Sequence, residues 1–500
     1  MTGREPLVKI LPGALRGRER DGVLLFAGIP YAAPVTGARR WAAPEPHEGW
    51  SGMRDARRFG PAAPQRPGTG LTAAPHAWDE DCLTLNVTTP ALDDARRPVL
   101  FWIHGGGFLT GKGGIPWYDG SSFARRGDVV TVTVNYRLGA LGFAHLAALA
   151  PELASTGLLG LLDQIAALEW VRDQIAAFGG DPARVTIAGE SAGAMSVGTL
   201  LGMPRARGLF RAAIAQSGAA HHHLSAAQAG EVADVLLAEL AVPRATDALR
   251  ALSVDAILDA QDRTQAVLAK RRGAGGVIAT MAFQPVVEGD ALPAPPLEAV
   301  RDGATRGIPL LVGTNADETT LFGYHLFDEA RLARLAAKIF PNPEAALDRY
   351  RRARPGASAG ELATALSTDQ IFRIPATRLC EAHSAAGGSA FAYLFTWRSR
   401  GFAGRLGATH ALEIPFAFHT LGRPGVAAFL GPGPLPTALA DAVHAAWTAF
   451  LHRGDPGCDG LGAEWPGFAA ERRAVMELGD RIGARDDPGA DERRLWDDLL

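Results

Sequence analysis

Short runs of apolar residues recur along the chain, and most of them end in a polar or glycine-rich turn. Runs of strand length occupy residues 98–103, 129–134, 185–188, 212–216, 307–314 and 390–395. Apolar runs of this kind are typical of the central strands of a parallel sheet, because helices cover both of its faces. Weaker patterns predict further strands at residues 7–11, 23–26 and 80–87.

Between these strands, apolar residues recur at steps of three and four, which is the period of a helix with one buried face. The clearest helix is predicted at residues 163–178, and Gly179-Gly180 marks its end. Further helices are predicted at 192–203 and within the alanine-rich stretch 222–275. This alternation predicts an α/β fold, with a large, mostly parallel sheet flanked by helices. The sequence has no internal repeat and no long low-complexity linker, so we expect a single domain over residues 1–500.

The composition is that of an ordinary globular protein, with 47% hydrophobic and 21% charged residues. A net charge of −3 offers no basic field for nucleic acid or for an anionic membrane surface. The N-terminal segment MTGREPLVKILPG lacks the apolar core of a signal peptide, and no apolar run reaches the length of a membrane span. The three cysteines are far apart and form no metal or disulfide pattern. We therefore expect a cytoplasmic protein.

One stretch organises the candidate chemistry, and it reads Gly189-Glu190-Ser191-Ala192-Gly193. It joins the strand predicted at 185–188 to the helix predicted at 192–203, and its G-x-S-x-G spacing is that of a nucleophile elbow. In such an elbow a strained turn presents the serine hydroxyl above the sheet. The hydroxyl becomes a useful nucleophile only when a base takes its proton and an acid holds that base in place.

A second candidate element is the run His104-Gly105-Gly106-Gly107, which follows directly on the buried strand at 98–103. Glycines let backbone N–H groups turn towards a developing negative charge without obstruction by side chains. The run therefore predicts an oxyanion loop. We expect His104 to brace this loop and not to act as a base.

The order of these motifs resembles the type-B carboxylesterase/cholinesterase family of α/β-hydrolases, nearly from end to end. The matching segments are FAGIPYA, EDCLTLNV, HGGGF, VTVNYRLGALGF, GESAGA, AIAQSG, QPVVEGD, LLVGTNADETTLF and GATHALEIPFAF. The resemblance implies an α/β-hydrolase fold whose helical insertions form an active-site gorge. It also implies hydrolysis of carboxylic esters through an acyl-enzyme, with no metal and no organic cofactor.

The resemblance also implies site residues. Ser191 is the nucleophile, His410 the general base, and Glu318 the acid that orients the histidine, with the neighbouring Asp317 as the competing choice. The remaining assignments are an oxyanion hole formed by the N–H groups of Gly106, Gly107 and Ala192, and a supporting hydrogen-bond network of Glu190, Ser217 and Glu413. For these last three residues a purely structural role stays open.

Other residues carry weaker hypotheses. His221-His222-His223 is expected to line a pocket or an exposed loop and not to bind a metal, because consecutive side chains diverge. Trp78, Phe108 and Phe322 are candidates for pocket walls, with core packing as the alternative for each. Secreted relatives pair the cysteine of the EDCL motif with an upstream one, but no cysteine precedes Cys82 here, so we expect no disulfide.

Three functions are compatible with the sequence. The first is ester hydrolysis, and the second is the same machinery acting on carbamates, amides or thioesters, or transferring the acyl group to an alcohol. The third is a non-catalytic binding protein on the same fold, which the joint presence of Ser191, Glu318 and His410 disfavours. The sequence indicates neither the physiological substrate nor whether the protein is a monomer or a small homo-oligomer.

Overall fold

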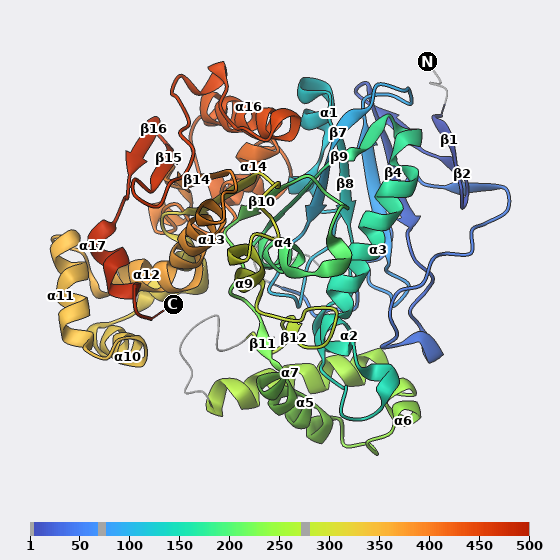
Figure 1. Cartoon of the computed structure of the whole chain (residues 1–500), viewed down its shortest axis with the longest axis horizontal. Coiled ribbons are helices and arrows are strands. Elements are labelled where there is room, and N and C mark those ends of the chain that lie inside the picture. The colour runs from blue at the N-terminus through green and yellow to red at the C-terminus, as the bar shows by residue number, and fades with distance from the viewer. Residues whose placement is uncertain (1–4, 69–76, 272–280, 500) are drawn as a thin grey trace.

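An 11-stranded sheet forms the centre of the protein (Figure 1). The computed structural model describes residues 5–68, 77–271 and 281–499. The strands follow the spatial order β16-β15-β14-β13-β10-β9-β7-β8-β6-β4-β3. Their bounds are β3 (Arg18–Arg20), β4 (Val23–Pro30), β6 (Thr84–Thr89), β7 (Arg97–Ile103), β8 (Val130–Val134), β9 (Gly180–Glu190), β10 (Ala212–Gln216), β13 (Leu310–Asn315), β14 (Ala390–Phe395), β15 (Ala474–Leu478) and β16 (Ile482–Asp486).

The middle of this sheet is parallel, as the apolar runs predict. Strands β8, β7, β9, β10, β13, β14 and β15 pair in parallel, whereas β6, β4, β3 and β16 add antiparallel edges. Parallel strands bring their carboxyl ends to one edge of the sheet, where ligands bind in open α/β folds. The loops that follow β7, β9 and β13 therefore converge there.

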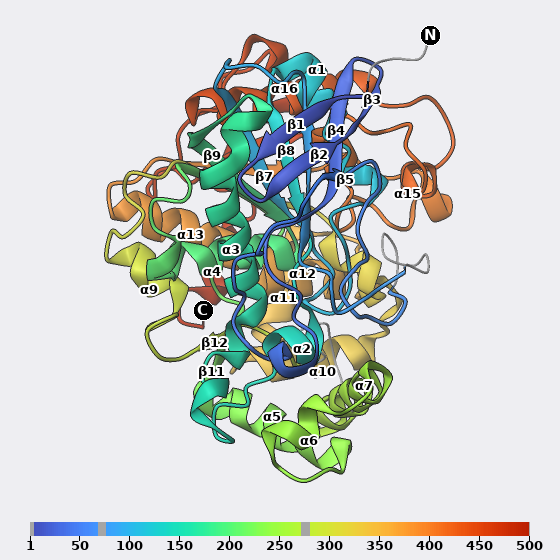
Figure 2. The same ribbon diagram turned by 90° about the vertical axis from the view of Figure 1, so that its right-hand side faces the viewer.

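Helices cover both faces of the sheet (Figure 2). Along β7 the side chains alternate between two hydrophobic clusters, because successive residues of a strand point to opposite faces. Val99, Phe101 and Ile103 belong to the cluster that includes α3 (Leu159–Gln174) and α4 (Ala192–Gly202). Leu100 and Trp102 belong to the cluster that includes α16 (Thr437–Arg453). The predicted arrangement of a sheet between two layers of helices is confirmed.

Helical insertions extend beyond these layers (Figure 1). One group, at the lower end of the view, consists of α5 (Ala226–Leu240), α6 (Thr246–Arg250) and α7 (Val254–Arg271). A second group has its own hydrophobic cluster with Trp496 near the C-terminus, and it contains α10 (Glu329–Ile339), α11 (Pro343–Ala353) and α12 (Ala359–Thr368). A π-helical turn, η10 (Asp369–Arg373), joins α12 to α13 (Ile374–Ala385).

The other elements are short. They comprise β1 (Leu7–Ile10), β2 (Gly13–Arg16), β5 (Met53–Asp55), β11 (Leu224–Ser225), β12 (Val286–Val287), α1 (Ser121–Gly127), α2 (Gly139–Phe143), α9 (Pro296–Arg301), α14 (Ile414–Ala417), α15 (Val426–Leu430) and α17 (Ala490–Arg493).

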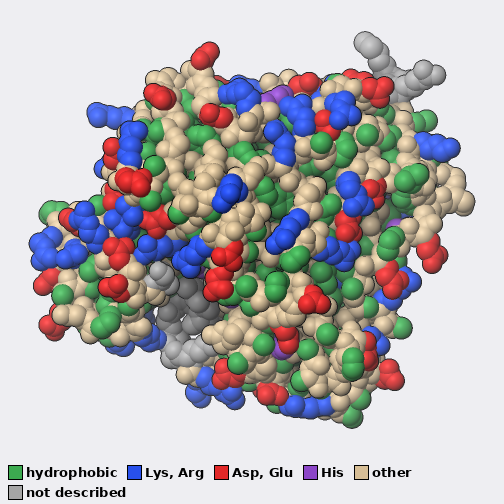
Figure 3. Space-filling view, viewed as in Figure 1, with side chains coloured by type: hydrophobic (Ala, Val, Ile, Leu, Met, Phe, Trp, Pro, Cys, Tyr) green, Lys and Arg blue, Asp and Glu red, His purple; other side chains and the backbone are tan. Residues whose placement is uncertain are grey.

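The surface carries charges of both signs. Figure 3 shows basic and acidic side chains interspersed over the face seen in Figure 1, which agrees with the small net charge of −3. Within the described ranges, no helix combines the length and the apolar character needed to cross a membrane.

Candidate active site

Ser191 lies on a strained turn between β9 and α4, as the elbow motif predicts. Its backbone has φ 57° and ψ −126°, which a residue with a side chain rarely adopts. The flanking glycines permit this close crossing. A Cβ on Gly189 would lie 2.4 Å from the backbone of Gly193, and a Cβ on Gly193 would lie 2.0 Å from the carbonyl oxygen of Ile103.

The glycine loop after β7 packs against this elbow. A Cβ on Gly105 would lie 2.9 Å from the Cβ of Ser191, so a larger residue there would displace the serine. Gly106 and Gly107 have φ of 116° and 63°, and a Cβ on Gly107 would meet only open space. Ala192 begins α4, and the free N–H groups and the dipole at a helix N-terminus favour negative charge. Gly106 and Gly107 line the same cavity as Ser191, and Ala192 follows Ser191 directly in the chain.

The structure brings His410 and Glu318 together. Nδ1 of His410 lies 2.6 Å from Oε2 of Glu318, and both side chains are buried. The other oxygen of Glu318 accepts a hydrogen bond of 2.7 Å from the backbone N–H of Asn315 at the end of β13. Asp317, the competing acid, instead accepts hydrogen bonds from Arg398 and from the backbone N–H of Ala408.

A buried network connects these elements beneath the site. Glu413 accepts hydrogen bonds from the side-chain amides of Asn315 at 2.6 Å and Gln216 at 3.1 Å. Asn315 Nδ2 also donates to the carbonyl of Thr409, next to His410, and the carbonyl of Gln216 accepts from the N–H of Ser191. Neither amide was singled out in the sequence, although both lie inside segments that resemble the family. The network links the backbones that carry Ser191, Glu318 and His410.

Glu190 contacts the opposite side of the histidine. Its Oε1 lies 3.1 Å from Nε2 of His410. Burial raises the pKa of Glu190 to about 8, and the carboxylates of Glu413 and Glu318 add to this rise while His410 opposes it. Burial lowers the pKa of His410, but the charges of Glu190 and Glu318 outweigh burial and raise it to about 9. Groups this close titrate as a pair, so the proton that the raised pKa keeps on the imidazole must leave before Nε2 can act as a base.

This arrangement predicts an unusually alkaline pH profile. A base with a raised pKa is protonated and inactive over a wider range, so kcat/KM for a neutral ester should rise with pH through a limb well above the ordinary histidine value of about 6.5. Glu190→Gln removes a charge that favours the protonated imidazole, so the limb should move to lower pH by on the order of one unit. The measurement is kcat/KM between about pH 5 and 10, the range in which histidine-dependent limbs fall.

Glu169→Gln is the matched control, because it removes a carboxylate from a surface ion pair with Arg205. We expect it to leave the limb in place. A limb that stays fixed or moves to higher pH in Glu190→Gln would contradict the electrostatic effect of Glu190 on the pKa of His410.

A cavity of about 370 Å³ opens above Ser191. The apolar side chains of its lining include Leu109, Met195, Met281, Leu321, Phe322, Ile371, Phe372, Ala411 and Phe429. The glycine loop, Ser191 and His410 lie on the same cavity. Among the described lining residues, Glu190, His410 and the Tyr118 phenol are the only ionisable side chains. The space thus suits an uncharged, largely apolar molecule.

Of the other candidate residues, His104 contacts the glycine loop, Phe322 lines the cavity and Phe108 lies in the core. His104 stacks on Tyr136 at 4.5 Å and its Nδ1 lies 2.8 Å from the carbonyl of Gly105, which fits the expected brace. Burial lowers the pKa of His104 to about 4, so its ring stays neutral. Phe322 lines the cavity, whereas Phe108 is fully buried and packs on Phe143 at 4.9 Å. Core packing is therefore the correct alternative for Phe108.

Trp78 and the histidine run lie elsewhere. Trp78 forms a β-bridge with Ala62 and is not among the residues that line the cavity above Ser191. Within the run, His222 is buried, which excludes the exposed loop at that position, and burial lowers its pKa to about 3. Across the described residues, no group of three or more His, Cys, Asp or Glu side chains could hold a metal ion.

Ser217 and Cys82 are both buried. Ser217 has φ 54°, and its hydroxyl has no hydrogen-bond partner among the described residues. Ser217 therefore shows no contact of the supporting kind expected for it, in contrast to Glu190 and Glu413. Cys82 is a free thiol, and burial raises its pKa.

The chain is similar to known proteins along nearly its whole length. The family model described as the carboxylesterase family matches residues 4–496. The para-nitrobenzyl esterase of Bacillus subtilis (strain 168) is 36% identical over 493 residues, which cover 96% of each chain. The phenmedipham hydrolase of Pseudarthrobacter oxydans is 38% identical over 490 residues, which cover 95% of each chain.

Solved structures give the same result. A carboxylesterase of Geobacillus stearothermophilus superposes with a TM-score of 0.87 at 40% identity, and the match covers 98% of this chain and 99% of that chain. The α/β-hydrolase fold expected from the sequence is confirmed.

Proposed function

Because this chain belongs to the carboxylesterase family and is a carboxylic ester hydrolase, we propose that Ser191, His410 and Glu318 carry out the hydrolysis. One observation carries the proposal. Ser191 and His410 line the same apolar cavity, and Glu318 contacts the far nitrogen of the imidazole at 2.6 Å. A serine, a histidine and a carboxylate in this relation are the parts of an acyl-transfer site.

The proposed reaction has two halves. In acylation, the Ser191 oxygen attacks the ester carbonyl carbon while its proton passes to Nε2 of His410. The carbonyl oxygen becomes negative and accepts hydrogen bonds from the N–H groups of Gly106, Gly107 and Ala192. His410 then protonates the leaving alcohol, and the acyl group remains on Ser191.

In deacylation, a water molecule replaces the alcohol. His410 removes its proton, the water oxygen attacks the acyl carbon, and the carboxylic acid leaves as Ser191 regains its proton. Glu318 accepts the hydrogen bond of Nδ1 in both halves and stabilises the positive charge on the imidazole ring. The Glu413–Asn315–Gln216 network holds the three loops in register.

The lining of the cavity narrows the substrate class. We propose that the preferred substrates are uncharged esters with apolar or aromatic groups, because the described lining offers a carboxyl group and no lysine or arginine. An anionic substrate would lose its hydration and would find no cation except the imidazolium of His410, which Glu190 and Glu318 already contact, so its burial costs several kcal/mol. The volume of about 370 Å³ suits small to medium esters.

A matched pair of substrates tests this function. Two p-nitrophenyl esters of similar acyl length are compared, one of a monocarboxylic acid and one of a dicarboxylic acid whose second carboxylate is free. We expect kcat/KM to be at least about 100-fold higher for the uncharged ester, because burial of the free carboxylate costs about 3 kcal/mol. Release of p-nitrophenol is the measurement. If no neutral ester of the series were turned over, the proposed function would fail. Equal rates for both esters would refute the substrate class alone.

A further inference from the structure

A π-helical turn forms one wall of the cavity. Turn η10 interrupts the helical path from α12 to α13, and it presents Ile371 and Phe372 to the cavity. The sequence explains the interruption, because Pro375 has no N–H to donate to the carbonyl of Ile371 in an α-helical pattern. Such turns are frequent at functional sites, where they aim a side chain that a regular helix would turn elsewhere.

Phe372 lies directly against the proposed base. Its ring centroid is 4.8 Å from that of His410 and 6.5 Å from that of Phe322, and its side chain is fully buried. Phe322 contacts the same imidazole at 5.3 Å. The two rings form a wall next to the atom that moves the proton. The position of Phe372 therefore limits the size of any substrate group beside His410.

The first residue of this turn is a buried acid with partners outside the site. Asp369 forms an ion pair with Arg373 at the other end of η10, and it accepts a hydrogen bond of 2.6 Å from the hydroxyl of Tyr350 on α11. The same hydroxyl accepts a bond of 3.1 Å from the indole N–H of Trp496. Asp369, Tyr350 and Trp496 are each at most 1% exposed. A continuous buried chain of contacts thus runs from the C-terminal segment to the turn.

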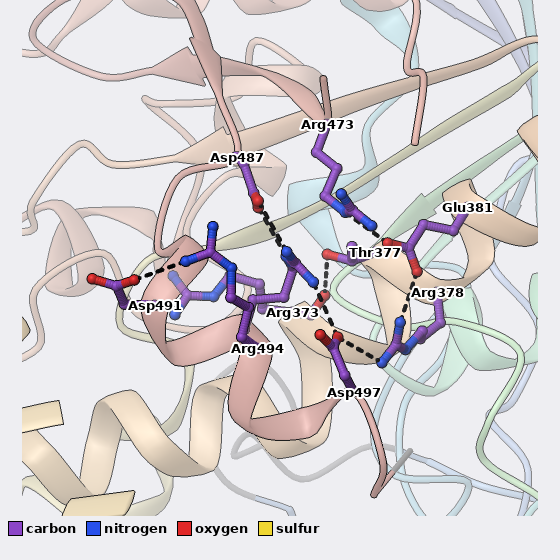
Figure 4. A network of polar contacts seen from close by, with 10 residues as sticks. Arg373, Thr377, Arg378, Glu381, Arg473, Asp487, Asp491, Arg494 and Asp497 are labelled. Carbon is purple, nitrogen blue, oxygen red and sulfur yellow. Dashed lines mark hydrogen bonds and ion pairs between the residues drawn. The ribbon is translucent and has the colours of Figure 1, made fainter. Parts of the chain in front are cut away.

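The C-terminal segment is itself firmly attached (Figure 4). Arg378 of α13 donates to the carbonyl of Trp496 at 3.2 Å and to the carboxylate of Asp497 at 3.3 Å. Arg493 pairs with Asp487, which follows β16. The C-terminal segment that carries Trp496 is therefore held from two sides, by α13 and by the end of the β15–β16 hairpin.

We propose that Asp369 is a positioning residue which, through Tyr350 and Trp496, fixes η10 so that Phe372 sets the size of the substrate group accepted beside His410. The inference rests on the proposed function. Asp369 touches no substrate and acts through the turn that it anchors. Loss of its charge removes the ion-pair partner of Arg373, whose side chain is only 19% exposed, and this disfavours the present form of the turn.

The test measures size discrimination as a ratio of kcat/KM values. Two series are used, p-nitrophenyl esters with acyl groups from acetyl to octanoyl, and acetate esters with alcohols from methyl to benzyl. Phe372→Ala should change the ratio of the bulkiest to the smallest substrate by roughly tenfold in one series, because a wall is removed. The same ratio is then measured for Asp369→Asn with the series that responds to Phe372→Ala. We expect it to change at least about threefold.

A double-mutant cycle shows whether Asp369 acts through Phe372. In the Phe372→Ala background, Asp369→Asn should leave the ratio unchanged, because the wall that it positions is absent. Tyr350→Phe removes only the hydroxyl and should shift the ratio in the same direction as Asp369→Asn. Asp173→Asn breaks an exposed ion pair with Arg172 and serves as the control with an unchanged ratio.

The outcomes distinguish a failure of the inference about Asp369 from a failure of the proposed function. If Asp369→Asn and Tyr350→Phe lower the melting temperature without changing the ratio, Asp369 is only structural and the inference is wrong. The same holds if Phe372→Ala alters neither series, or if the effects of Asp369→Asn and Phe372→Ala on the ratio simply add. If the wild-type protein shows no Ser191-dependent turnover, it is the proposed function that fails.

Discussion

Ser191→Ala is expected to lower kcat for a neutral p-nitrophenyl ester by roughly 10⁴- to 10⁶-fold. Without the hydroxyl no acyl-enzyme can form, and only the oxyanion donors and the binding cavity remain to assist attack by water. The melting temperature should stay close to that of the wild type. The change removes one side-chain oxygen and leaves the strained backbone of the elbow as it is. Steady-state kinetics with a correction for spontaneous hydrolysis provide the measurement.

Ser51→Ala is a suitable control, since Ser51 is exposed and lies outside the residues that line the cavity. It should retain wild-type kinetics. Retention of most of the activity by Ser191→Ala would mean that another group is the nucleophile.

Glu318→Gln should reduce kcat by roughly 10³- to 10⁴-fold, because a glutamine amide can donate to Nδ1 and stabilise the wrong tautomer of His410. The isosteric change keeps the volume of a fully buried side chain. The neighbouring change Asp317→Asn provides the matched comparison. Asp317 forms a partly exposed ion pair with Arg398, and the loss of such a pair costs up to about 1 kcal/mol of stability.

The comparison of kcat values at one saturating ester concentration decides between the two acids. We expect Asp317→Asn to remain within about threefold of the wild type, since surface pairs of this kind contribute little. A larger loss for Asp317→Asn than for Glu318→Gln would transfer the role of the acid to Asp317.

Much of the sheet could be predicted because its central strands are buried on both faces. Their apolar runs carry the signal, and β10 and β14 have the bounds that the runs at 212–216 and 390–395 predict. The hairpin β15–β16 was not predicted. In β15 buried and half-buried residues alternate, and β16 is largely exposed with the sequence IGARD, so neither shows an apolar run of full strand length.

The candidate site was predicted from sequence motifs. Features of the site that the motifs do not encode could not be predicted. Two adjacent acids cannot be told apart by spacing, because the direction of each side chain depends on the turn after β13. The place of Phe372 beside His410 arises from a π-helical turn and from contacts between residues far apart in the sequence. Pro375 was the one local signal for that turn. A proline within a helical pattern indicates an interruption, but not which side chain the interruption will aim.

The two edges of the sheet have a consequence for solubility. A sheet that does not close into a barrel exposes unpaired backbone groups on its outermost strands, which can recruit another chain. Here one edge is β3, with the sequence Arg18-Glu19-Arg20 and every residue exposed. The other edge is β16, which ends in the exposed residues Arg485 and Asp486. Edge-to-edge pairing would have to bury these charges, so both ends of the sheet are protected against aggregation.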